Sequence, residues 1–140
     1  MITHALRIAA YVMTTFAVQM VSHFIVNAEH YAAVGHMRAE PIFALGVLAM
    51  LIQCTALSSL YARSQWARSS MLSSLQFGWL VGVFLVSYLA LAEAAKYTVP
   101  AVLPWLGTEI AVGFVQFTIY GALLGLLDVQ RRDSRAAAAV

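Results

Sequence analysis

The side chains best suited to chemistry gather at one end of the apolar segments of this chain. They include all four Glu and three of the four His: His23, Glu29, His30, His36, Glu40, Glu93 and Glu109. Imidazole and carboxylate groups are the usual ligands of zinc, iron, copper and manganese. They also exchange protons, because His titrates near neutral pH and a buried carboxyl group can approach it. The cluster therefore predicts either proton or ion handling, or a metal or haem site.

Within this cluster, His23 lies deepest in an apolar segment, which makes it a candidate functional residue. In an enzyme, we expect His23, Glu29 and Glu93 to be the catalytic residues, with a carboxylate carrying protons. His23 and His30 are seven residues apart on one helix face, so either one could be an axial haem ligand. A metal ion would be bound by ligands from both halves of the chain: His30, Glu29, Glu93 and Glu109. The sequence does not identify the cofactor.

The same acids have a plainer explanation as charged groups at the surface. Glu29 would pair with Arg38, and Glu93 would pair with Lys96 three residues later on the same helix. An acid at the start of a helix also complements the positive end of the helix dipole. Two acids precede apolar segments in this way and are predicted helix caps: Glu40 and Glu109. Under this hypothesis the carboxylates face water and take part in no reaction.

A polar stripe runs along the first apolar segment. Its members follow at spacings of four, four, four and three residues: Thr15, Gln19, His23, Asn27 and His30. These spacings place the side chains on one face of a helix. Because lipid offers no hydrogen bonds, we expect the stripe to face the bundle interior or a neighbouring subunit.

Three glutamines fall near the middle of three different segments: Gln19, Gln53 and Gln116. An amide in hydrocarbon is costly unless it is hydrogen-bonded, so we expect these side chains to bond to one another across the bundle. Such bonds contribute about 0.6 kcal/mol each on average. Together with Asn27 they form the predicted polar core, which either stabilises the bundle or lines a path for protons or a solute.

Four stretches contain no Asp, Glu, Lys or Arg: residues 8–28, 41–62, 69–92 and 110–127. A bilayer core needs about 20 apolar residues per helix, and the chain is 62% hydrophobic and only 10% charged. We therefore expect an all-α integral membrane protein, a bundle of four transmembrane helices over residues 5–30, 41–62, 70–96 and 106–127. The expected domains are a transmembrane domain, 1–128, and a cytoplasmic tail, 129–140.

Orientation follows from the distribution of Lys and Arg around these segments. Six of the eight lie at one end: Arg7, Arg63, Arg68, Arg131, Arg132 and Arg135. The opposite end has only Arg38 and Lys96. By the positive-inside rule, both termini are predicted to be cytoplasmic, in a multi-pass protein of the cell inner membrane. The net charge of +2 is too small to predict nucleic-acid binding.

Small residues on two segments predict close helix packing. Gly78 and Gly82 form one GxxxG pair, and Gly121 and Gly125 form another. The pairs serve either packing within the chain or contacts in a homo-oligomer or larger membrane complex, and we expect such an assembly. The single Cys54 is expected to be a small core residue.

No specific catalytic motif is present, since the chain lacks CxxC, HExxH, GxSxG and a phosphate-binding loop. The first functional hypothesis is a small accessory subunit, or an ion- or proton-handling component, that uses the His/Glu cluster. The alternative is a membrane-embedded enzyme that binds a metal ion or haem through His23 or His30. The sequence does not decide whether the protein is an enzyme.

Overall fold

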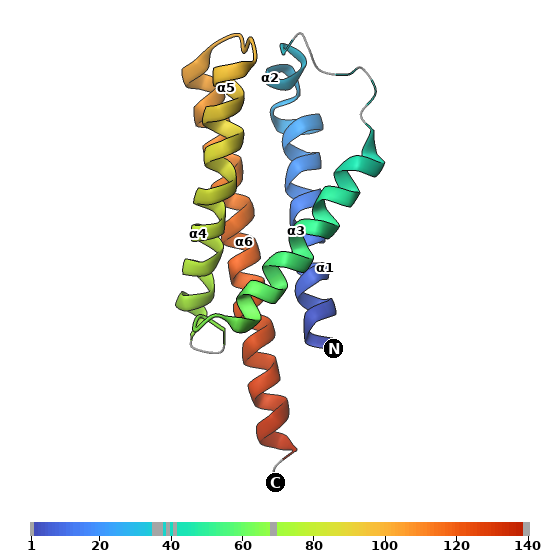
Figure 1. The fold of residues 1–140 in the computed structure, drawn as a ribbon, viewed down its shortest axis with the longest axis vertical. Helices are drawn as coiled ribbons and strands as arrows, with labels where there is room; N and C mark the ends of the chain where they lie inside the picture. The colour runs from blue at the N-terminus through green and yellow to red at the C-terminus, as the bar shows by residue number, and fades with distance from the viewer. Residues whose placement is uncertain (1, 35–37, 39, 41, 68–69, 139–140) are drawn as a thin grey trace.

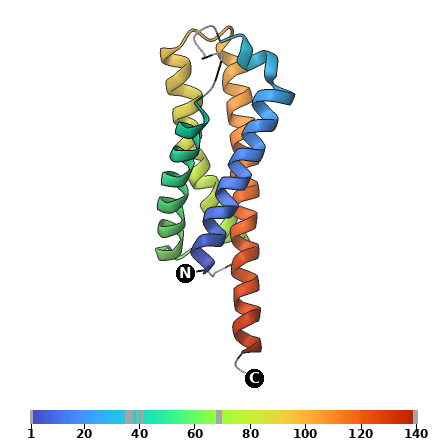
Figure 2. The ribbon, with the colours of Figure 1, turned by 90° about the vertical axis from the view of Figure 1, so that its right-hand side faces the viewer.

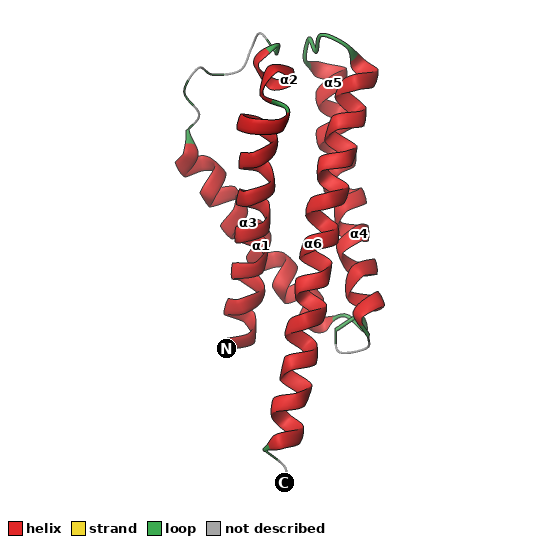
Figure 3. Ribbon diagram, turned by 180° about the vertical axis from the view of Figure 1, so that it is seen from behind, coloured by secondary structure: helices red, strands yellow, loops and turns green. Residues whose placement is uncertain are grey.

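The fold consists of helices joined by short connections. A computed structural model describes residues 2–34, 38, 40, 42–67 and 70–138, which form helices, turns and loops without any strand (Figure 3). Four helical segments are long and apolar enough to cross a membrane: Thr3–Val26, Phe43–Arg63, Met71–Lys96 and Val102–Ser134. The predicted all-helical architecture with four such helices is confirmed, and it indicates a multi-pass membrane protein.

Two of these segments are interrupted in the same way (Figure 1). The first consists of α1 (Ile2–Val21), the π-helical turn η1 (Ser22–Val26) and α2 (Ala28–Ala32). The third consists of α4 (Met71–Ser87), the π-helical turn η2 (Tyr88–Ala92) and α5 (Glu93–Lys96). The second and fourth are the single helices α3 (Phe43–Arg63) and α6 (Val102–Ala137). A π turn contains one extra residue, so it changes the direction of the side chains that follow it.

The helices pack around α6, which contacts both α1 and α4 along their length (Figures 1 and 2). We call the end with α2 and α5 the hairpin end, and the opposite end, where α1 begins and α3 approaches α4, the terminal end. α3 packs against α1 but leans away from it towards the hairpin end (Figure 1). This divergence opens the bundle at the hairpin end.

Local chemistry explains where helices begin, and it corrects the predicted limits of the last one. The Ser70 hydroxyl accepts a hydrogen bond from the backbone N–H of Ser73 at 3.0 Å, which caps α4. α6 begins at Val102, four residues before the predicted start. Pro104 lies within its first turn, where a proline is tolerated because the missing N–H would have no partner inside the helix. α6 continues to Ala137, so residues 129–137 are helical, and their assignment to a cytoplasmic tail stays a prediction.

The glycine pairs serve packing between α4 and α6 within the chain. A Cβ atom at Gly78 would overlap the carbonyl oxygen of Phe117 and lie 3.0 Å from the Cα of Gly121. A Cβ atom at Gly121 would lie 2.9 Å from the Cα of Leu75. Gly82 faces the Phe117 side chain in the same interface. The glycine faces therefore give no support to an oligomer contact, and the assembly stays a prediction.

Replacing Gly78 by Ala is expected to lower the free energy of unfolding by about 1–3 kcal/mol, because the added methyl group forces the two backbones apart. Gly107→Ala is the matched control, since no atom lies within 4 Å of a Cβ at that position. It should be neutral or stabilising by up to about 1 kcal/mol through helix propensity. Unfolding in mixed micelles, followed by circular dichroism, measures both changes. Equal effects would contradict this account of the interface.

A buried ion pair joins the helices at the terminal end. Arg7 Nη2 of α1 donates to Asp128 Oδ1 of α6 at 2.8 Å, and both side chains are only 2% exposed. Tyr61 of α3 donates its hydroxyl to Asp128 Oδ2 at 2.9 Å and lies 2.7 Å from Ser74 Oγ of α4. Four helices thus contribute one side chain each. Arg7 is therefore part of the core, although its position before the first apolar segment predicted only a topological charge.

Candidate functional site

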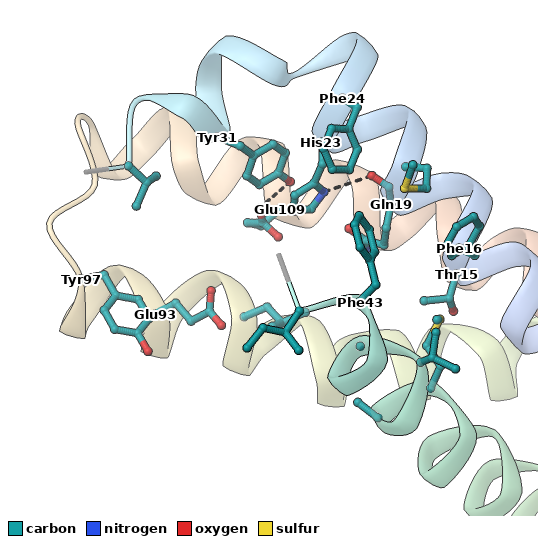
Figure 4. A pocket seen from close by; sticks show the side chains of 18 of the residues that line it. Thr15, Phe16, Gln19, His23, Phe24, Tyr31, Phe43, Glu93, Tyr97 and Glu109 are labelled. Carbon is teal, nitrogen blue, oxygen red and sulfur yellow. Dashed lines mark hydrogen bonds between the residues drawn. The ribbon is translucent and has the colours of Figure 1, made fainter. Parts of the chain in front are cut away.

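A cavity of about 620 Å³ lies at the hairpin end, where α3 diverges from α1 (Figure 4). Its walls come from α1 and η1, from α3, and from the third and fourth segments across the bundle. Six aromatic side chains are among its lining residues: Phe16, Phe24, Tyr31, Phe43, Tyr97 and Trp105. Its polar lining consists mainly of Thr15, Gln19, His23, Glu93 and Glu109. A cavity of this size and character is typical of a site for a small, largely apolar molecule.

His23, Tyr31 and Glu109 form the polar centre of this cavity (Figure 4). The Tyr31 hydroxyl donates to Glu109 Oε1 at 2.8 Å. The rings of His23 and Tyr31 stack with their centroids 3.6 Å apart, and Glu109 lies near enough to His23 for their charges to interact. His23 Nδ1 lies 3.1 Å from the Gln19 carbonyl oxygen, so the Nδ1–H tautomer donates there. The imidazole is thereby oriented by its own helix.

The pKa of the Tyr31 hydroxyl is raised, first by burial and then by the nearby carboxylates of Glu109 and Glu93. Tyr31 therefore remains a hydrogen-bond donor at neutral pH. The carboxylate of Glu109 accepts this bond and keeps lone pairs for a further partner. The site thus presents a carboxylate that is held in place by a neutral donor.

The two π turns lie next to the ionisable groups of the cavity. His23 belongs to η1, and Glu93 directly follows η2. The wider turn at η1 closes with a bond from Asn27 N to Ser22 O at 2.8 Å. Such turns are frequent at functional sites, where the extra residue redirects side chains out of regular register. Neither turn was predicted from the sequence.

The Glu residues at the hairpin end differ in whether their side chains line the cavity. Glu109 is two turns inside α6 and faces the cavity, so its predicted capping role is wrong. Glu93 also lines the cavity. Lys96 donates from Nζ to the Tyr88 hydroxyl at 3.4 Å, and its predicted pairing with Glu93 stays a prediction. Glu29 is exposed and is not among the lining residues, which separates it from the other predicted catalytic residues.

The polar stripe of the first segment is continuous only as far as η1. Thr15, Gln19 and His23 all line the cavity, as a single helix face should. Beyond the π turn, Asn27 donates from Nδ2 to Ser22 Oγ at 2.9 Å, and His30 stacks on Trp105 at 5.2 Å between centroids. The extra residue of the turn shifts the register, but Asn27 and His30 still contact buried groups of the bundle, Ser22 and Trp105, as a stripe facing the interior should. Glu40 is exposed, and His36 falls outside the described residues.

The predicted amide contacts form in part. Gln19 Nε2 donates to Gln116 Oε1 at 2.8 Å, and Gln116 Nε2 donates to Thr15 Oγ1 at 3.1 Å. Gln53 instead accepts a bond from the Tyr11 hydroxyl at 2.8 Å. These side chains surround a second cavity of about 100 Å³, which we call the central cavity. Cys54 is buried in the core, as expected.

The structure gives no support to a metal or haem site. Within the described part of the chain, no group of three or more His, Cys, Asp or Glu side chains is placed to hold a metal ion. The ring of His23 stacks on Tyr31 and that of His30 on Trp105. The metal set of His30, Glu29, Glu93 and Glu109 is therefore divided, since Glu29 is exposed and only Glu93 and Glu109 line the cavity.

Comparison with known proteins does not add a function. No protein-family model, no curated protein and no solved structure matches this chain.

Sequence reasoning missed the aromatic character of the site, and above all Tyr31 and Trp105. Both are 5% exposed and pack together with their ring centroids 5.9 Å apart. Tyr31 directly follows His30, the last residue of the polar stripe. This position was the signal available in the sequence. Trp105 was not placed on a helix, because the fourth transmembrane helix was predicted to begin at residue 106.

Proposed function

We propose that this protein is an ion-handling membrane protein that binds lipophilic organic cations in the cavity at the hairpin end. The observation that carries the proposal is the composition of the cavity wall. Two carboxylates, Glu93 and Glu109, line an otherwise mainly apolar and aromatic space, and no Lys or Arg is among its described lining residues. The cavity is therefore suited to a positive charge on an apolar body.

Two physical effects favour such a ligand. A charge in a partly buried site interacts more strongly with a carboxylate than the same pair does in water. Aromatic rings attract cations through their negative faces, and the six aromatic side chains of the lining supply several such faces. An anion would be repelled by the carboxylates and would not be attracted by the negative faces of the aromatic rings.

The Glu109 carboxylate can accept a further partner in addition to Tyr31. Because the Tyr31 hydroxyl donates to Oε1, the second carboxylate oxygen keeps its lone pairs for a bound cation.

We place the hairpin end on the outer side of the inner membrane, with both termini cytoplasmic. Six of the eight Lys and Arg residues support this orientation, although Arg7 is paired with Asp128. The cavity then opens towards the outer half of the bilayer, where apolar cations accumulate beneath the headgroups.

Binding of tetraphenylphosphonium tests the proposal directly. We expect this cation to bind saturably to the purified protein in nanodiscs, measured by isothermal titration calorimetry against empty nanodiscs. Tetraphenylborate has nearly the same shape and the opposite charge, so it should show no saturable binding. If both ions bind equally, the site recognises apolar molecules without regard to charge, and the proposal is wrong. The proposal is also wrong if the cation does not bind.

A further inference from the structure

The hairpin-end cavity has an open side between α1 and α3, which we call the portal. Two of the residues that line the cavity, Tyr31 and Trp105, are only 5% exposed. Four others are between 42% and 55% exposed although they also line it: Phe16, Phe24, Phe43 and Val47. The cavity is therefore closed on the side of α2 and α6 and open on the side of α1 and α3.

The portal lies at the level of the hydrocarbon. Its four exposed residues belong to two of the segments that are long and apolar enough to cross a membrane, Thr3–Val26 and Phe43–Arg63. The first two turns of α3, residues 43–49, are exposed at every position and contain no polar side chain. In a bilayer this surface contacts acyl chains, because water does not reach the hydrocarbon core. A molecule that enters through the portal therefore comes from the bilayer.

Gly46 keeps space free at the portal. Four residues of α3 that line the cavity follow at spacings of three, one and three residues, which places them on one helix face: Phe43, Gly46, Val47 and Met50. No atom lies within 4 Å of the position that a Cβ atom of Gly46 would take. A larger side chain at this position would project into the space between α3 and α1. The glycine therefore leaves room for part of a ligand.

The negative charge of the cavity comes from the other two segments. Glu93 directly follows η2, and Glu109 belongs to α6, whereas every described lining residue from α3 is apolar (Figure 4). The cavity thus has carboxylates on one pair of segments and an apolar opening on the other. A ligand with a cationic head and one apolar tail matches both parts. Its tail can stay in the hydrocarbon, so binding does not require the transfer of apolar surface into water.

We infer that the ligands of this cavity are single-chain cationic amphiphiles that enter from the bilayer through the portal. The cationic head lies beside Glu93 and Glu109, and the tail passes between α1 and α3 into the hydrocarbon. Gly46 is a specificity-determining residue, because its missing side chain leaves the space that the tail occupies. The inference rests on the proposed function and specifies the ligand of the same site.

Two probes with the same head test this inference, since methyltriphenylphosphonium and dodecyltriphenylphosphonium differ only in the tail. Isothermal titration calorimetry measures their binding to the full-length protein in nanodiscs. Each Kd is expressed against the concentration of the probe in the membrane, which partition into empty nanodiscs supplies. We expect the two Kd values of the wild type to agree within about threefold, because the tail has the same surroundings before and after binding.

Replacing Gly46 by Phe is expected to weaken binding of the dodecyl probe by at least about tenfold more than binding of the methyl probe, because the added ring fills the portal. Gly107→Phe is the matched control. It adds the same side chain at a position where no atom lies within 4 Å of a Cβ and which is not among the lining residues of the cavity. It should leave both Kd values unchanged. Circular dichroism checks the folding of both variants.

The outcomes separate this inference from the proposed function. If the wild type binds the methyl probe but binds the dodecyl probe about tenfold more weakly or worse, the cavity has no portal and the inference is wrong, while cation binding stands. The same conclusion follows if Gly46→Phe weakens both probes equally. If neither probe binds, the proposed function and the inference are both wrong. The wild-type comparison needs no variant, so it decides the question even if Gly46→Phe does not fold.

Discussion

Replacing Asp128 by Asn is expected to lower the free energy of unfolding by about 3–5 kcal/mol, the usual cost of removing one partner from a buried ion pair. The substitution keeps the size of the side chain but removes its charge. Arg7, which is 2% exposed, then loses the carboxylate that lies 2.8 Å from its Nη2 atom. A buried guanidinium without a counter-ion is the main source of the loss, and unfolding in mixed micelles measures it.

Two further variants show whether the loss arises from the buried charge. Asp133→Asn makes the same chemical change at an exposed position of the same helix, so its effect should stay within about 0.5 kcal/mol. The double change Arg7→Met with Asp128→Leu removes both charges and should recover most of the stability, because apolar pairs of similar volume often replace buried ion pairs without loss. Equal stabilities for Asp128→Asn and Asp133→Asn would show that the pair contributes nothing.

The Arg7–Asp128 pair also shows what sequence reasoning overlooked. Each residue adjoins an apolar segment, Arg7 before the first and Asp128 after the fourth, at the same predicted end. That coincidence was a signal for pairing across 121 positions. Counting Arg7 only as a topological charge concealed it, because such counts assume that every basic residue reaches the headgroups.

The periodicity of apolar and polar residues predicted the regular helices correctly, but it did not predict the π turns. Four apolar segments, and the contact of Gln19 with Gln116, followed from composition and from the cost of an unpaired amide. The π turns did not follow, since an extra residue in a helix depends on packing against neighbouring helices and leaves no composition signal. The stripe therefore lines the cavity only up to His23 in η1, whereas the errors at Glu109 and Trp105 arose from the earlier start of α6.

The His/Glu cluster was predicted as one group, whereas the structure divides it by environment. Glu93 and Glu109 line the cavity, but Glu29 and Glu40 are exposed. All four lie near the same end of the bundle, so sequence position alone could not separate them. Their separation depends on the direction in which each helix presents its side chain, which is a property of the packed bundle.

Changing Glu109 to Gln is expected to weaken tetraphenylphosphonium binding by at least about tenfold, because the site loses half of its negative charge in a partly desolvated cavity. The amide oxygen can still accept the Tyr31 hydroxyl, which now donates to Glu109 Oε1 at 2.8 Å. The local geometry is therefore retained while the charge is removed. Isothermal titration calorimetry in nanodiscs measures the change in Kd.

Glu29→Gln is the matched control for this prediction, since it makes the same charge change at an exposed position of the same end. It should bind the cation with the wild-type Kd if binding depends on the cavity and not on the general potential of the surface. If both variants weaken binding equally, the cavity carboxylates have no special role and the assignment of the site is wrong.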